Sequence, residues 1–89
     1  MRDLFRLCIV TGDATVLDTQ VQSVNLPMDF GSFGILANHA PMLCAVSKGI
    51  LRCRLEDGST VRVRVSSGVA NVIDNELTLL CSDAAVVGE

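Results

Sequence analysis

The chain has 89 residues and a formal net charge of −3, with seven Lys and Arg against ten Asp and Glu. This length suits a single domain over residues 1–89, and 49% hydrophobic with 19% charged residues indicates a chain that folds. The acidic balance argues against a nucleic-acid binder, and the lack of Trp and Tyr removes the aromatic platforms on which bases and sugars stack.

The N-terminal third of the chain predicts two strands. Side chains of a strand point to opposite faces with period two, so apolar residues at that spacing share a buried face. The two apolar sets are Phe5, Leu7 and Ile9 in the first segment, and Val21, Val24 and Leu26 in the second. We expect the second strand to end at Pro27, because proline has no N–H to donate to a neighbouring strand.

A glycine-flanked loop, Gly31 to Gly34, follows these strands. It lacks the Gly-Lys-Ser/Thr ending of a phosphate loop and the third glycine of a dinucleotide fingerprint, so it does not predict nucleotide binding. It does hold two large apolar side chains, Phe30 and Phe33. Such side chains either fill the core beneath a loop or anchor a partner, and residue types alone favour neither reading.

Residues 51–65 show the cleanest alternation and predict a hairpin. Its apolar positions are Leu51, Cys53, Leu55, Val61, Val63 and Val65. We expect a three-residue loop of Asp57, Gly58 and Ser59, because this loop pairs Leu55 with Val61 and keeps the apolar side chains on one face.

The other face of this hairpin carries Arg52, Arg54, Arg62 and Arg64. The expected register puts Arg54 opposite Arg62 and Arg52 opposite Arg64, and like charges so placed cost up to about 1 kcal/mol per pair. Two readings remain open. The arginines bind phosphate or an acidic protein surface, or they form a solvated face that Glu56, Asp57 or a neighbouring strand neutralises.

The C-terminal third predicts one more alternating strand, through Leu77, Leu79 and Cys81, after a turn at Asp74 and Asn75. No window carries the apolar stripe of an amphipathic helix. We therefore expect an all-β fold, a sandwich or flattened barrel of short strands.

Neither the single histidine nor the cysteines predict an active or metal site. His39 has no local nucleophile motif, and we expect its ring to hydrogen-bond backbone and shape a turn. No two cysteines lie two to four residues apart, as zinc knuckles require, and Cys53 and Cys81 fall on expected core faces. We thus predict no catalytic residue, no metal, no cofactor and no small-molecule substrate.

The printed chain contains no apolar run of the roughly 20 residues that span a bilayer, and it begins without the apolar block of a signal peptide. We expect no membrane insertion, a soluble domain in a reducing compartment, and four free thiols.

Three blocks carry a family resemblance: GSFGIL over residues 31–36, HAPML over residues 39–43 and KGILR over residues 48–52. They resemble the N-terminal domain of the epsilon subunit of the F-type ATP synthase, with its G-x-x-G-I-x-x-x-H-A-P-x-L block. Weaker similarity continues through Ser66 to Val69 and Glu76 to Ala84, with Ser67 where the family more often has glycine.

The resemblance implies a sandwich of about ten short strands in two antiparallel sheets. It implies a non-catalytic rotor subunit of the central stalk that binds the gamma subunit and the c-ring and couples ion-driven rotation to ATP synthesis. It also implies a peripheral location at the cytoplasmic face of a bacterial inner membrane or its equivalent. By matching position, the c-ring contact comprises Asp29, Phe30, Gly31, Ser32 and Phe33, and the gamma contact comprises Thr11, His39 and Cys44.

Family members usually add a C-terminal helical hairpin that inhibits ATP hydrolysis and, in some, binds ATP. The printed chain ends at Glu89, so we expect neither property from it. Two other functional readings stand beside the stalk subunit. One is a stand-alone β-sandwich adaptor that binds an acidic protein through its arginines, and the other is a small enzyme or metal domain using His39 and the thiols.

Overall fold

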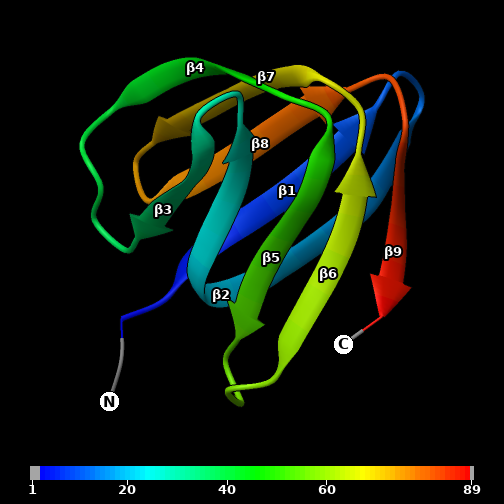
Figure 1. The fold of residues 1–89 in the computed structure, drawn as a ribbon. Helices are drawn as coiled ribbons and strands as arrows, with labels where there is room; N and C mark the ends of the chain where they lie inside the picture. The colour runs from blue at the N-terminus through cyan, green and yellow to red at the C-terminus, as the bar shows by residue number, and fades with distance from the viewer. Residues whose placement is uncertain (1–2, 89) are drawn as a thin grey trace.

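The computed structural model describes residues 3–88, and these form nine β-strands and no helix (Figure 1). The strands are β1 Phe5–Thr11, β2 Ala14–Met28, β3 Gly31–Leu36, β4 Met42–Val46, β5 Gly49–Leu55, β6 Thr60–Val65, β7 Gly68–Ile73, β8 Glu76–Cys81 and β9 Ala84–Gly88. The all-β prediction is confirmed, with nine strands over the described residues in place of about ten.

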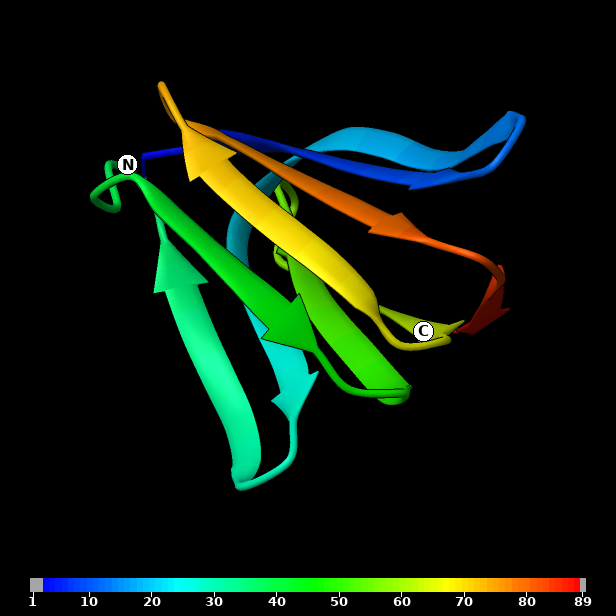
Figure 2. The same ribbon diagram turned by 90° about the horizontal axis from the view of Figure 1, so that it is seen from above.

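The two layers of the sandwich share one long strand. Hydrogen bonds join the strands in the order β4-β7-β8-β1-β2-β5-β6-β9, with β3 also paired to β2. The first part of β2, up to Val21, pairs with β1, and the part from Val21 onward pairs with β5 and β3. Figure 2 shows β2 passing from one layer to the other. The pair β1 and β8 is parallel, which differs from the expected purely antiparallel sheets.

The core lies between the layers and follows the period-two pattern. Phe5, Leu7 and Ile9 of β1 are buried, as predicted, and they face buried side chains of the other layer. The remaining core residues are Val21, Val24, Leu26, Ile35, Val46, Leu51, Cys53, Val63, Val65, Ala70, Val72, Leu77, Leu79 and Cys81. Cys53 and Cys81 thus occupy the core positions expected of them.

Strand β2 continues through Pro27, so the expectation that it ends there is wrong. Pro27 lies opposite Ser32 of β3. Strand β2 pairs with β5 only as far as Asn25, so Pro27 needs no N–H to donate to β5. The carbonyl oxygen of Pro27 accepts a hydrogen bond from the backbone N–H of Ser47 at 3.0 Å.

The loop between β5 and β6 begins one residue earlier than predicted. The N–H of Leu55 donates to the carbonyl oxygen of Ser59 at 2.8 Å, which leaves Glu56, Asp57 and Gly58 as the loop. Three-residue loops end on a left-handed residue, and Gly58, with φ of 91°, adopts that conformation without a Cβ clash. The Asp57 carboxylate also accepts hydrogen bonds from the N–H and hydroxyl of Ser59, at 2.9 and 2.7 Å.

Because the loop begins one residue earlier, the register of β5 with β6 differs from the expected one by two residues. Each side chain keeps its expected face. The expected pairs Leu55 with Val61, Arg54 with Arg62 and Arg52 with Arg64 are therefore wrong. The observed pairs are Cys53 with Val61, Arg52 with Arg62, Arg54 with Thr60 and Ile50 with Arg64. One arginine pair, Arg52 with Arg62, remains directly opposed.

Candidate interaction surfaces

The outer side of the β4-β7-β8-β1 layer carries a row of apolar side chains. Ala45 lies opposite Val69, Val69 opposite Leu80, and Leu80 opposite Val10. Leu43 is the next outward residue on β4 and is 72% exposed, and Leu80 is 55% exposed. We call the surface formed by Val10, Leu43, Ala45, Val69 and Leu80 the apolar outer face. Exposed apolar side chains that adjoin one another in this way are typical of protein-binding surfaces.

A charged cluster borders the apolar outer face on the same layer. The Arg6 guanidinium donates from Nε and Nη2 to the two carboxylate oxygens of Asp18, at 2.8 and 2.6 Å, and Nη1 lies 3.0 Å from Glu76 Oε2. The hydrogen bond from Arg6 lowers the pKa of Asp18, and the same bond raises the pKa of Arg6. These side chains form part of a polar rim beside the apolar row.

The lowered pKa of Asp18 predicts an acid-sensitive contribution to stability. This contribution is fully present above the ordinary aspartate pKa of 3.8 and is lost as the pH falls through the lower, folded-state value. Asp18→Asn should therefore melt a few degrees below the wild type near neutral pH and at nearly the same temperature near about pH 2. Thermal melts over this pH range test the prediction, with Asp13→Asn in the exposed β1–β2 turn as control. A constant difference at every pH would contradict it.

The turn between β2 and β3 presents an exposed phenylalanine. Phe30 is 76% exposed, while Phe33 is half-buried, lies opposite Leu26 and packs against the core. The turn is fixed to the β4–β5 loop, because the Ser47 hydroxyl donates to Asp29 Oδ1 at 2.5 Å. An open hollow of about 460 Å³ adjoins it, lined by Met28, Asp29, Phe30, Ala45, Val46, Ser47, Lys48 and Ser67.

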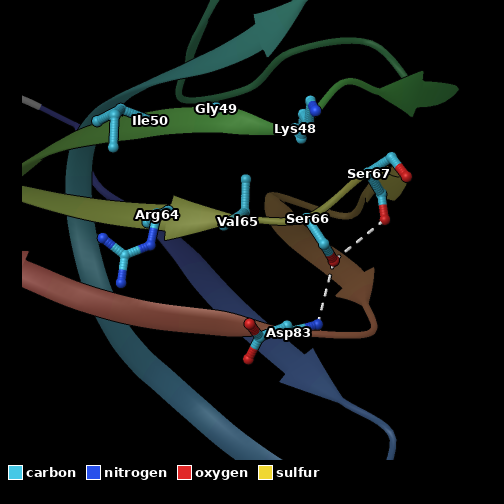
Figure 3. A pocket seen from close by; sticks show the side chains of 8 residues that line it. All are labelled: Lys48, Gly49, Ile50, Arg64, Val65, Ser66, Ser67 and Asp83. Atoms are coloured by element: carbon cyan, nitrogen blue, oxygen red, sulfur yellow. Dashed lines mark hydrogen bonds between the residues drawn. The ribbon is translucent and has the colours of Figure 1, made fainter.

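A second open hollow, of about 570 Å³, lies at the same end of the sandwich (Figure 3). Lys48, Arg64, Ser66 and Asp83 are among its lining residues. The hydroxyl oxygen of Ser66 accepts hydrogen bonds from the backbone N–H groups of Ser82 and Asp83, each at 3.1 Å. Ser66 therefore holds the β6–β7 and β8–β9 connections together, and its hydroxyl oxygen is occupied by these bonds.

His39 shapes a turn, as expected. Its Nδ1 donates to the carbonyl oxygen of Ala40 at 2.8 Å, and its ring meets the Phe33 ring edge-on, with centroids 6.1 Å apart. The preceding Asn38 has φ of 63°, and its N–H donates to Oδ1 of Asn75 at 2.7 Å. The ring of His39 thus packs the β3–β4 connection against Phe33.

The three residues expected at the gamma contact do not adjoin one another. His39 precedes β4, whereas Thr11 lies at the far end of β1, its hydroxyl 3.4 Å from the carbonyl oxygen of Ala14. Cys44 is half-buried on the inner side of β4 and packs against the core. The sequence reading did not find the apolar outer face. The signal for it was the apolar character of both faces of β4 and β8, as in the pairs Leu43 with Cys44 and Leu79 with Leu80.

Between residues 3 and 88, no group of three or more His, Cys, Asp or Glu side chains is placed to hold a metal ion. The same residues contain no helix with the length and apolar character needed to cross a bilayer.

Comparison with known proteins gives a family. The model of the family described as "ATP synthase, Delta/Epsilon chain, beta-sandwich domain" matches residues 4–87. The chain is 41% identical over 78 residues to the chloroplastic ATP synthase epsilon chain of Piper cenocladum, and 42% identical over 79 residues to that of Ipomoea batatas. These alignments cover 88% and 89% of this chain but only 58% and 59% of the relatives. The chain thus spans somewhat over half the length of the curated relatives it matches.

Two solved structures share the fold. One is a chain of the Euglena gracilis mitochondrial ATP synthase, with a TM-score of 0.86 and 24% identity, covering 93% of this chain and 53% of that one. The other is a chain of the central stalk and c-ring of the Tetrahymena thermophila mitochondrial ATP synthase, with a TM-score of 0.76 and 15% identity, covering 94% of this chain and 67% of that one. At these identities the likeness establishes the fold.

The expectation of a bacterial inner membrane is wrong. The relatives are chloroplastic epsilon chains, and the structural neighbours are mitochondrial. The resemblance could not make this distinction, because the matching blocks carry no feature specific to one compartment.

Proposed function

The chain belongs to the ATP synthase delta/epsilon family through its β-sandwich domain, and we propose that it is a non-catalytic subunit of the central stalk. In this proposal it binds the gamma subunit and the c-ring and helps to couple ion-driven rotation to ATP synthesis. The observation that carries the proposal is the apolar outer face, because a rotor subunit must be held by a partner through surface that remains exposed in the free domain.

We assign the gamma contact to the apolar outer face. Val69 and Leu80 lie side by side at its centre, and the Arg6 cluster lies at one margin. An apolar centre within a polar rim is the usual composition of a specific protein interface. Thr11, His39 and Cys44 stay a prediction for the same contact, and Cys44 would act through the packing of β4 because its side chain faces inward.

We assign the c-ring contact to the β2–β3 turn. Phe30 projects from this turn with most of its side chain exposed, and the bond between Ser47 and Asp29 holds the turn against the β4–β5 loop. A fixed turn loses less conformational entropy on binding than a mobile one. Ala45 of the apolar outer face also lines the hollow beside Phe30, so the two proposed contacts meet at this end of the domain.

The gamma contact is tested by two matched substitutions. Leu80→Glu places a carboxylate in the apolar outer face, whereas Val86→Glu introduces the same charge at a side chain of similar exposure on β9, 51% against 55%. We expect Leu80→Glu to weaken binding to purified gamma subunit at least about tenfold, or 1.4 kcal/mol, and Val86→Glu to leave it unchanged. Biolayer interferometry measures the affinities, and circular dichroism checks the fold. Equal affinities of the two variants would contradict the assignment.

A further inference from the structure

Four arginines lie together on the outer side of β5 and β6, which we call the arginine face: Arg52, Arg54, Arg62 and Arg64. All are exposed and alternate with side chains that face the core. Between residues 3 and 88, the only salt bridges are those of Arg6 with Asp18 and Glu76. None of these four guanidinium groups therefore forms a salt bridge with a carboxylate of residues 3–88, although Asp83 lines the same hollow as Arg64.

The arginine face is positively charged, whereas the chain as a whole is negatively charged. The protein carries a net charge of −3, yet four of its seven basic residues share one surface. Arg52 and Arg62 are directly opposite in the ladder, an arrangement that weakens a sheet. The nearest loop holds Glu56 and Asp57, but neither carboxylate forms a salt bridge with these arginines. A partner that supplies negative charge would relieve the repulsion between Arg52 and Arg62, which no salt bridge within residues 3–88 relieves.

The geometry fits an extended set of carboxylates. Alternate residues along a strand are about 7 Å apart, so the guanidinium groups form two parallel rows of donors. A shallow hollow of about 190 Å³ beside them is lined by Ser23, Asn25, Arg52, Cys53, Arg54 and Thr60, which add hydroxyl and amide groups. Guanidinium groups bind carboxylates through two parallel hydrogen bonds.

We propose that the arginine face docks an acidic segment of another protein, several of whose Asp or Glu side chains pair with the arginines. The groups are exposed and spread over two strands, whereas a single phosphate is held by convergent donors. Beside Arg52 and Arg54 lie the polar Ser23, Asn25 and Thr60, and the apolar neighbours in the ladder are limited to Ile50 and Ala85 opposite Arg64, which is less apolar surface than entry into a lipid surface needs. The face lies on the layer opposite the apolar outer face (Figure 2), so this docking is independent of the gamma contact.

A decaglutamate peptide is the probe that tests this proposal. We expect it to shift the backbone NMR signals of β5 and β6 in the isotope-labelled chain at low salt, with decaglutamine giving no shifts. Arg62→Gln should weaken this binding at least about fivefold, and Arg52→Gln with Arg62→Gln more than about tenfold. Lys48→Gln, which removes the same charge from the β4–β5 loop, should weaken it less than about twofold.

Four results would overturn the proposal. An equal loss in Arg62→Gln and Lys48→Gln would mean that the peptide responds to net charge alone. Tighter binding to vesicles rich in phosphatidylglycerol, or displacement of the peptide by millimolar inorganic phosphate, would replace the acidic protein by a lipid surface or a phosphate. Lack of any saturable shift would remove the site. Gamma binding by Arg62→Gln should be unchanged, so failure here leaves the proposed function standing.

Discussion

Gly68→Ala should lower the free energy of unfolding by about 3 kcal/mol or more, the upper end for added atoms in a packed interior. A Cβ at Gly68 would overlap the carbonyl oxygen of Leu80 and lie 2.9 Å from Cβ of Cys81. Leu80 and Cys81 belong to β8, which pairs with Gly68 on one side, while Val46 of β4 pairs with it on the other. Backbone held between two strands cannot move aside, so the ladder must open locally.

Gly12→Ala provides the matched control. A Cβ at Gly12, in the β1–β2 turn, meets no atom within 4 Å. For a domain of this size, about 3 kcal/mol corresponds to a fall in melting temperature of roughly 12 °C or more, whereas Gly12→Ala should stay within about 2 °C of wild type. Thermal unfolding followed by circular dichroism gives both values. A melting temperature for Gly68→Ala close to that of Gly12→Ala would mean that β7 and β8 can separate without cost.

The neighbouring Ser67 shows what the family pattern leaves open. By the resemblance, glycine is the more usual residue at this position, and glycine readily adopts a left-handed conformation. Ser67 is not among the described residues with positive φ, so a serine fits this position without strain. The constraint lies instead at Gly68, which the β8 backbone approaches so closely that a side chain would not fit.

Local patterns predicted the strands well because burial on one face imposes period two. Leu77, Leu79 and Cys81 follow that rule, and the turn at Asp74 and Asn75 has the positive φ angles, 52° and 63°, that a two-residue hairpin requires. The parallel pairing of β1 with β8 joins segments about 70 residues apart and leaves no local signal. The continuation of β2 through Pro27 depends on which neighbour lies on each side, which is a property of the sheet.

Surfaces were harder to predict than strands because their residues come together only through the register. The arginine face was visible within one hairpin, although its pairing depended on which loop residue takes the left-handed conformation, namely Gly58. The apolar outer face gathers one or two residues from each of four strands. Val10, Val69 and Leu80 appear as ordinary strand residues until the ladder places them in one row.

The two phenylalanines of the β2–β3 region should separate stability from assembly. Phe33 packs against the core, Leu26 and the His39 ring, so Phe33→Ser should cost about 2–3 kcal/mol, somewhat less than a fully buried phenylalanine. Phe30 is 76% exposed, so Phe30→Ser should leave the melting temperature within about 2 °C of wild type. Circular dichroism melts of the two variants test this difference.

Assembly should respond in the opposite order if the β2–β3 turn contacts the c-ring as proposed. Phe30 is the large apolar side chain that this turn offers to a partner, and an apolar anchor at an interface centre typically contributes about 1–4 kcal/mol. Phe30→Ser should therefore weaken co-sedimentation with purified c-ring about tenfold or more, while the folded fraction of Phe33→Ser, measured below its melting temperature, retains binding. If Phe30→Ser melts the domain and Phe33→Ser does not, the two roles are reversed. If Phe30→Ser folds normally and binds the c-ring as the wild type does, the ring contacts another part of the surface.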